Sequence, residues 1–348
     1  MAAFILRKLL YGILVLAGVV VLVFVLFQGF GDPSRLVMGQ TGDAATRENI
    51  RKELYLDQPK WKQFFLYLND VSPIAIHSRD EIKTKELKGF FIGGNTKLAI
   101  KLPYLRKSYQ TRQSVSQILL EALPGTLLLA AAAMFIAVVL GIPLGMLAAV
   151  KQHTWLDTAA VFGSIIGISA PSFFMGIIIA YVFGFVLSHW TGLNITGSWF
   201  EIDALSGARG LSLQNLILPA VTLGIRPLAI ITQLTRSSML DVLDQDFIRT
   251  AYAKGLSRRT VIWRHALRNA LNPVITAITG WFAELLAGAF FIEYIFGWRG
   301  IGKVTVDALE KLDFPVVMGA VLVSALFFIL INIIADVLYG IIDPRVRT

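Results

Sequence analysis

Long apolar runs separated by polar segments dominate this chain. A hydrocarbon core of roughly 30 Å is crossed by about 20 apolar residues in a helix, and about six stretches reach or approach that length. They lie near 9–30, 123–150, 159–187, 216–234, 270–292 and 316–339. The fourth is the weakest because it contains Pro219, Arg226 and Pro227. The pattern predicts an all-α membrane protein with about six transmembrane helices.

The first apolar run resembles a secretory signal peptide, because Arg7 and Lys8 precede it. Its length of about 20 residues exceeds the roughly 7–15 of a signal core, and no small-x-small cleavage site follows it. We therefore expect a transmembrane helix at 1–30. An extracytoplasmic loop or small domain at 31–122 and a five-helix core at 123–348 follow.

Basic residues near the span ends indicate the orientation, since Lys and Arg are enriched in short cytoplasmic loops. Arg7 and Lys8 place the N-terminus inside, and six crossings then place 151–157, 236–269 and the C-terminal tail inside as well. The basic residues of the longest of these loops are Arg236, Arg249, Lys254, Arg258, Arg259, Arg264 and Arg268. The loop at 31–122 is also basic, but segments beyond about 60 residues are largely exempt from the rule. We expect a multi-pass protein of the inner or plasma membrane.

Composition agrees with a bilayer protein and narrows the chemistry. Hydrophobic residues make up 55% of the chain and charged residues 16%, against about 25% charged in soluble domains. The net charge of +9 is explained by the cytoplasmic loops, and no nucleic-acid-binding signature accompanies it. The absence of cysteine excludes disulfides and thiolate metal sites. No metal site is expected from the scattered histidines, His77, His153, His189 and His265.

A polar loop of about 34 residues at 236–269 is long for a connection between two spans. Asp246 can cap a helix over 247–254, and Gly255 suits the left-handed position that ends a helix. Ser257 can cap a second helix, whose apolar side is formed by Val261, Ile262, His265, Ala266 and Ala270. Two short helices of this kind would form a rigid docking surface. The alternative is a solvated basic loop that only sets the topology.

This loop resembles that of a known family. The run Asp246-Phe-Ile-Arg-Thr-Ala-Tyr-Ala-Lys-Gly-Leu-Ser, then His265-Ala-Leu-Arg-Asn-Ala and Pro273, is similar to the permease loop of ABC importers. More narrowly, it resembles the first permease subunit of the dipeptide/oligopeptide/nickel class. Further matches follow in order along nearly the whole chain: Leu6-Arg-Lys-Leu-Leu, Gly31-Asp-Pro, Leu54-Tyr-Leu-Asp-Gln-Pro, Leu123-Pro-Gly-Thr, Ala170-Pro-Ser-Phe, Leu234-Thr-Arg-Ser-Ser-Met-Leu, Phe314-Pro-Val-Val and Asp343-Pro-Arg.

The resemblance implies a type I importer permease fold and a pore-forming, non-catalytic subunit for peptides, with nickel or another small solute as the alternative cargo. It implies a homologous second permease, two ATPase subunits and an extracytoplasmic substrate-binding protein as partners. ATP and Mg would be used by the ATPase subunits, so this chain would bind no cofactor.

The resemblance also implies which residues dock the ATPase. They are Asp246, Arg249, Thr250, Ala251, Ala253, Lys254, Gly255, Leu256 and His265. Ala251 and Gly255 would be small residues that permit close docking, and Arg249 and Lys254 would reach acidic partners. In the general importer motif a glutamate stands where Arg249 falls, and a proline follows more closely than Pro273. Both departures resemble the usual pattern of the peptide class.

Two ionisable residues lie inside expected spans, which is energetically costly and makes them functional candidates. Arg226 and Glu284 are predicted at similar depths, about 12–15 Å below the outer surface at 1.5 Å per residue. Neither is typical of the family. Our hypothesis is that they pair or line the transport pathway. The alternatives are a purely structural ion pair or misplaced span boundaries.

Two glycine motifs have competing interpretations. The run from Gly297 to Lys303 nearly matches a phosphate-binding loop, but Val304 stands where Ser or Thr should bind magnesium. No strand precedes it and it is expected outside, so we interpret it as a turn. The pairs Gly141/Gly145 and Gly163/Gly167 are expected to permit close helix packing.

Two other functional classes remain open from the residues. An accessory membrane protein with a basic docking loop would leave the ordered family matches unexplained. A membrane enzyme subunit would need paired His or carboxylate ligands that the spans lack. The basic external segment at 69–113 is expected either to help seat a binding protein or to be a surface insertion.

Overall fold

The computed structural model describes residues 2–29, 48, 51, 55–202 and 209–342. The family-like motifs at Gly31 and Asp343, and the first residue of the motif at Leu54, lie outside these residues. The chain forms two compact units. The core unit comprises Met1–Leu6, Pro124–Lys303 and Phe327–Thr348, and the sheet unit comprises Arg7–Leu123 and Val304–Leu326.

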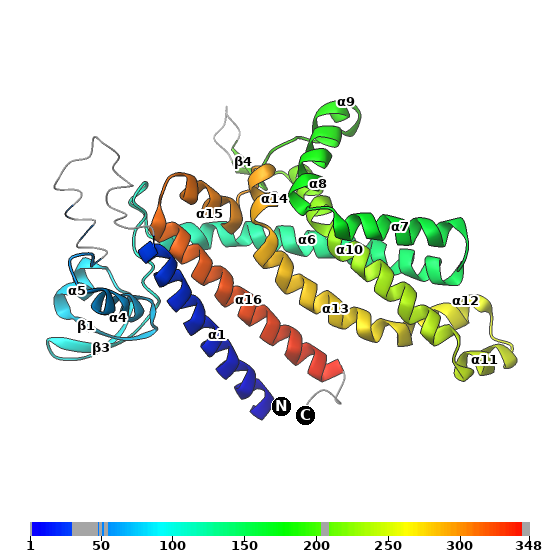
Figure 1. The fold of residues 1–348 in the computed structure, drawn as a ribbon, viewed down its shortest axis with the longest axis horizontal. Coiled ribbons are helices and arrows are strands. Elements are labelled where there is room, and N and C mark those ends of the chain that lie inside the picture. The colour runs from blue at the N-terminus through cyan, green and yellow to red at the C-terminus, as the bar shows by residue number, and fades with distance from the viewer. Residues whose placement is uncertain (1, 30–47, 49–50, 52–54, 203–208, 343–348) are drawn as a thin grey trace. The chain divides into compact units, whose positions relative to one another are not determined.

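The core unit is built mainly from helices (Figure 1). Its elements, some shared with the sheet unit, are α6 (Val115–Val150), α7 (Trp155–Ser169), α8 (Ser172–Ile179), η1 (Ala180–Val186), α9 (Ser188–Thr191), β4 (Phe200–Ile202), β5 (Arg209–Leu211), α10 (Gln214–Leu243), α11 (Asp246–Ala253), α12 (Arg258–Thr260), η2 (Val261–Ala266), α13 (Leu267–Gly288), α14 (Phe290–Ile295), α15 (Ile301–Glu310) and α16 (Phe314–Ile342). Helix α10 is central, because both α7 and α13 pack along it (Figure 1).

Glycines on α6 and α10 explain how closely these helices pack. A Cβ on Gly145 would lie 2.4 Å from the carbonyl oxygen of Thr232, and one on Gly224 would lie 2.8 Å from that of Ala133. The expected packing role is therefore confirmed for Gly141 and Gly145. It fails for Gly163, where a Cβ would meet nothing within 4 Å, because this part of α7 lines an open pocket beside α10.

Four described helices are long and apolar enough to cross a membrane, or five if one bent pair counts as a single span. The bent pair is the span expected at 159–187, whose two helical parts meet at 108°. Helix α7 ends here because Pro171 disfavours a helical conformation at Ala170. The span expected at 270–292 is helical as α13, but its polar residues, including Asn272 and Glu284, keep it below the apolar level of the others.

The chain is mostly helical, as expected, and the sheet unit adds strands that the sequence did not predict. This unit contains α4 (Lys60–Val71), β1 (Ile74–Ser78), α5 (Arg79–Thr84), β2 (Gly89–Gly93) and β3 (Thr96–Lys101), together with most of α1 (Ala2–Gly29). The strands form an antiparallel sheet in the order β1-β3-β2. A two-residue Gly-Asn loop, typical of tight hairpins, joins β2 to β3.

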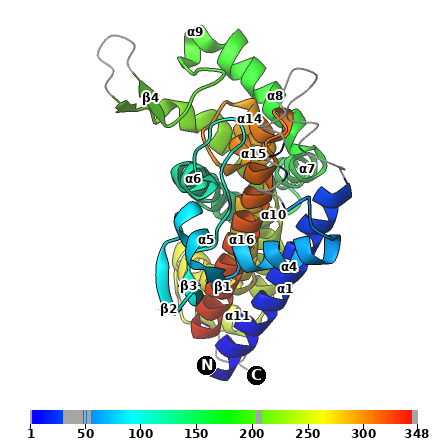
Figure 2. The ribbon, with the colours of Figure 1, turned by 90° about the vertical axis from the view of Figure 1, so that its left-hand side faces the viewer.

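Helix α4 is held against two apolar helices and the sheet. Its Tyr67 is buried with Val20 and Val23 of α1 and Leu322 of α16. The rings of Phe64 and Phe24 meet edge to face with centroids 5.1 Å apart. Figure 2 shows α4 crossing α1.

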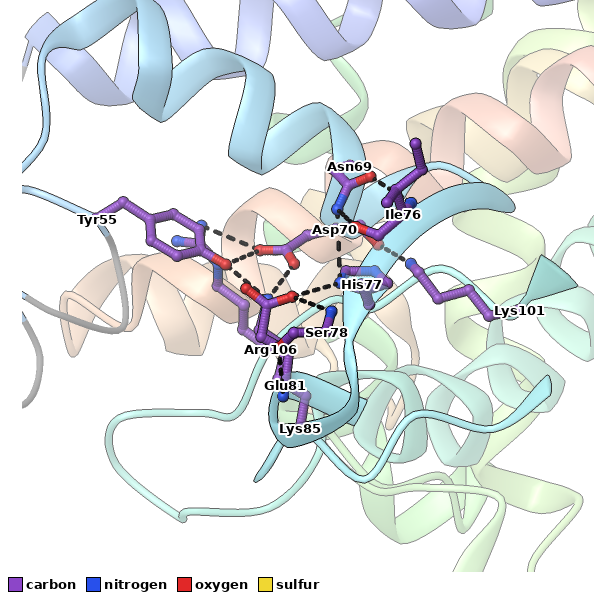
Figure 3. A network of polar contacts seen from close by, with 10 residues as sticks. All are labelled: Tyr55, Asn69, Asp70, Ile76, His77, Ser78, Glu81, Lys85, Lys101 and Arg106. Carbon is purple, nitrogen blue, oxygen red and sulfur yellow. Dashed lines mark hydrogen bonds and ion pairs between the residues drawn. The ribbon is translucent and has the colours of Figure 1, made fainter. Parts of the chain in front are cut away.

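A polar network fixes the other side of α4 (Figure 3). The Asp70 carboxylate accepts hydrogen bonds from Lys85 Nζ at 2.6 Å and Tyr55 OH at 3.1 Å, and Arg106 lies 3.7 Å away. The Asp70 carbonyl accepts a hydrogen bond from Lys101 Nζ. Burial lowers the pKa of Lys101 to about 8, because water no longer stabilises the ammonium.

Candidate functional site

The expected coupling segment begins with helix α11. Its N-cap is Gln245, which has an extended backbone and makes no side-chain cap hydrogen bond. Asp246 is therefore the first helical residue and not the cap that the sequence predicted. Its carboxylate accepts a hydrogen bond from Arg249 Nη1 at 3.3 Å, and a negative charge in the first turn is favoured by the helix dipole.

The end of α11 agrees with the sequence. Gly255 has φ +77°, the left-handed conformation that glycine adopts without steric cost. The Gly255 amide donates to the carbonyl of Tyr252 at 2.9 Å, and the Leu256 amide donates to that of Ala251 at 3.3 Å. This pair of bonds is a Schellman motif, so the chain leaves α11 in a defined direction.

The second expected helix is shorter and continuous with the next span. The Ser257 hydroxyl accepts a hydrogen bond from the Thr260 amide at 3.3 Å, as predicted for a cap. From Arg258 the chain runs through α12 and the π-helical η2 directly into α13. The loop therefore joins α13 without a flexible connection.

Burial separates the two sides of α11. Ile248 and Ala251 are only 2% and 6% exposed and pack inside the chain. We call the buried residues around them the α11 seat: Met146, Ala149, Met239, Val242, Ile248, Ala251, Val261, Ala266, Leu267 and Ala270. Ala251 thus faces its own chain. Its expected part in docking a partner stays a prediction, and its methyl packs inside this chain.

The opposite side of α11 is exposed and defines the α11 surface. It consists of Asp246, Phe247, Arg249, Thr250, Tyr252, Ala253, Lys254, Gly255 and Leu256. All the predicted docking residues belong to it except Ala251, which is buried, and His265, which is half-buried on η2. The surface combines aromatic and aliphatic groups with both signs of charge, a mixture suited to a protein partner.

One ion pair between α7 and α10 was not anticipated. Arg236 Nε donates to Asp157 Oδ1 at 2.5 Å, and Arg236 Nη2 donates to Oδ2 at 2.9 Å. The His153 amide adds a third hydrogen bond to Asp157 at 3.0 Å. This bidentate pair ties the first turn of α7 to α10. The two residues are 79 positions apart, so no local pattern signals the contact.

The structure brings Arg226 of α10 and Glu284 of α13 together. Arg226 Nη1 lies 4.0 Å from Glu284 Oε1, and the two side chains are 54% and 55% exposed. The Arg226 guanidinium also lies 5.3 Å from the ring centroid of Trp281. The exposed side of α13 continues with Asn272, Thr276 and Gly280, so the pair lies on a polar stripe of the chain's surface.

The turn after α14 explains the resemblance to a phosphate-binding loop. Glu293 is fully buried, and its carboxylate accepts hydrogen bonds from Thr126 Oγ1 at 2.7 Å and the Lys303 amide at 3.1 Å. A Cβ on Gly300 would lie 2.4 Å from this carboxylate. The carboxyl group of Glu293 therefore occupies the helix N-terminus where a phosphate would bind. Sequence reasoning interpreted the turn correctly but did not single out Glu293.

Comparison with known families gives two adjoining matches. The family described as binding-protein-dependent transport system inner membrane component matches residues 141–348. Its N-terminal companion, described as binding-protein-dependent transport system membrane component, N-terminal, matches residues 1–130.

Relatives along the whole chain carry transport names. The chain is 35% identical to the dipeptide transport system permease protein DppB of Escherichia coli K12, covering 100% of this chain and 99% of that protein. It is 34% identical to the oligopeptide transport system permease protein AppB of Bacillus subtilis 168, covering 100% of both. An inward-facing structure of the MetNI methionine ABC transporter matches with a TM-score of 0.50 and 17% identity, over 65% of this chain and 97% of the matched chain.

Proposed function

The chain belongs to the family of binding-protein-dependent transport system inner membrane components, and on that premise we propose that it forms half of the transmembrane pathway of an ATP-driven peptide importer. It is a multi-pass membrane protein. The names of its full-length relatives support dipeptides or short oligopeptides as the cargo. A second, homologous permease completes the pathway, and a soluble binding protein delivers the peptide.

The α11 surface carries this proposal. It is exposed on one side and fixed on the other by the α11 seat, which is what a contact that transmits force requires. Two ATPase subunits, which use ATP and Mg, dock on this surface and on that of the second permease. Their closure moves α11, and the continuous helix from Arg258 carries the movement into α13.

A bulky substitution on the exposed side tests the docking. Ala253→Trp changes the α11 surface without entering the α11 seat, so the chain should insert and fold normally. We expect the ATPase subunits to be lost from the purified complex and peptide uptake to fall at least tenfold. Thr84→Trp, at a position on α5 that is also exposed, is the matched control. An Ala253→Trp complex that retains its ATPase subunits and full uptake would contradict the proposal.

We assign the Arg226–Glu284 pair to the pathway. Charged side chains in contact with lipid are costly, yet both are about half exposed on the chain's surface. Facing a water-filled path or the second permease removes that cost. The pair offers one positive and one negative group, which complement the carboxylate and ammonium ends of a short peptide.

Charge exchange tests this assignment. Arg226→Glu and Glu284→Arg should each reduce peptide uptake strongly, because each leaves two like charges adjacent. The double variant should recover a substantial part of the lost peptide uptake. A separate competition experiment, with peptides blocked at either end and with nickel, identifies the cargo. Normal uptake by both single variants, or no recovery in the double variant, would remove the pair from the pathway.

A further inference from the structure

The three-stranded sheet has an apolar face that nothing in the described chain covers. Two rows of side chains cross the strands in register. Ile74, Ile100 and Phe90 form one row, and Ile76, Leu98 and Ile92 form the other. Their exposed fractions run from 48% for Leu98 to 79% for Phe90. These six residues are called the sheet face.

The outward positions of this sheet are apolar, where those of an ordinary one-sided sheet are polar. The alternate positions of β1 and β3, such as Ala75 and Ala99, are buried on the side of α4 and α5. In a soluble domain with one buried side, the outward positions are polar. A contiguous apolar patch of this kind marks contact with a partner or a membrane.

The position of the sheet within its unit indicates whether the contact is with a protein partner or with the membrane. Helix α4 packs on Val20 and Val23 of α1 and on Leu322 of α16. Both helices are candidate membrane spans, over Phe4–Phe27 and Phe314–Val337. Helix α4 thus packs beside the C-terminal part of α1, within the residues of the candidate span and not beyond its end.

The sheet lies on one particular side of α4. Figures 1 and 2 both show the sheet on the side of α4 that points toward the N-terminal half of α1. Because α1 enters the bilayer in that direction, this is the lipid side of α4. A soluble partner approaching from the water would meet α4 and α5 first.

We propose that the sheet face rests on the adjacent lipid leaflet. Its six apolar side chains enter the interfacial region, and the strand edges stay among headgroups and water, where their backbone groups can be satisfied. Residues 55–114 carry eleven Lys and Arg against five Asp and Glu. The excess of positive charge favours anionic headgroups around the sheet face.

Spin labelling tests this contact directly, since the chain has no cysteine. Nitroxide labels are placed singly at Ile76→Cys and Ile92→Cys, with Thr84→Cys on α5 as the control. The full complex is reconstituted in nanodiscs of phosphatidylethanolamine and phosphatidylglycerol. Accessibility to oxygen, which partitions into lipid, is compared with accessibility to a water-soluble nickel chelate.

We expect the two sheet labels to favour oxygen over the nickel chelate at least twofold more than the control label does. Equal accessibility of the sheet and control labels to the nickel chelate would overturn the proposal. If that accessibility then falls when the soluble binding protein is added, the sheet face is a protein-docking surface instead.

Discussion

At the scale of single residues, buried ionisable groups fix the geometry of both units. Asp70 joins α4 to Tyr55 and Lys85 in the sheet unit. Glu293 joins α14 to Thr126 and the start of α15 in the core unit. In each case one carboxylate satisfies several donors, so removing it leaves buried donors unpaired, which is more costly than losing one hydrogen bond.

Lys101 makes the sheet unit sensitive to pH. Its pKa of about 8, against the usual 10.5, means that the unfolded chain binds more protons between these values, so stability rises with pH there. Burial also raises the pKa of Tyr55 and Tyr67 above their usual 10.0, so stability falls again above about pH 10. We expect maximal resistance to denaturant near pH 10.

The ε-methylene carbon signals of isotope-labelled lysine in the full chain would report the titration of Lys101. Unfolding by denaturant at pH 7.5 and 9.5 would report the stability, and the Lys101→Met variant should lose the rise between them. Titration of Lys101 at the usual 10.5 would contradict the prediction.

Glu293 is expected to be structurally essential. Glu293→Gln keeps the shape but replaces one acceptor with a donor facing backbone amides, so we expect a loss of about 1–3 kcal/mol in stability. Glu86→Gln, at a largely exposed surface pair, should stay within about 0.5 kcal/mol. Denaturant unfolding of the purified chain measures both. Equal stability of the two variants would show that the Glu293 hydrogen bonds contribute little.

Residue roles set by the local backbone were predictable, and those set by distant partners were not. Gly255 and Ser257 end and begin helices through bonds to residues within five positions, so the sequence was sufficient. Asp157 and Glu293 act through partners 79 and 167 positions away. Asp246 was misplaced by one position, because Gln245 has the extended backbone of a cap without a capping side chain.

At the scale of elements, close approach of α6 and α10 depends on specific glycines, whereas α7 has spare room. Gly145→Ala should destabilise the chain by more than about 2 kcal/mol, since its Cβ would meet backbone at 2.4 Å. Gly163→Ala should be neutral or stabilising by up to about 1 kcal/mol, from helix propensity alone. Unfolding in a denaturing detergent compares them, and equal effects would contradict the packing.

Apolar length predicted most spans, because it reports burial in lipid directly. It missed the bend at Ala170–Pro171, where the apolar pattern continues although the helix direction changes. It also missed β1, β2 and β3. Their exposed positions are as apolar as their buried ones, so the alternation that identifies a strand is absent.

At the scale of the whole molecule, the predicted orientation can be tested by labelling intact cells. The positive loop at 236–269 should face the cytoplasm and the sheet unit's α5 the outside. A membrane-impermeant maleimide should therefore react with Thr84→Cys in intact cells. It should react with Arg259→Cys only after permeabilisation. The opposite pattern would place the α11 surface where no ATPase reaches it.

The α11 seat has a mechanical consequence. Its side chains come from the ends of α6 and α10 as well as from α11, η2 and α13, and packed interiors compress little. A force on α11 is not absorbed by a flexible connection, because α11 is packed against several helices at once. Such a force must therefore tilt these helices together. Movement of a docked ATPase would thus be passed through several helices to the far side of the bilayer with little loss.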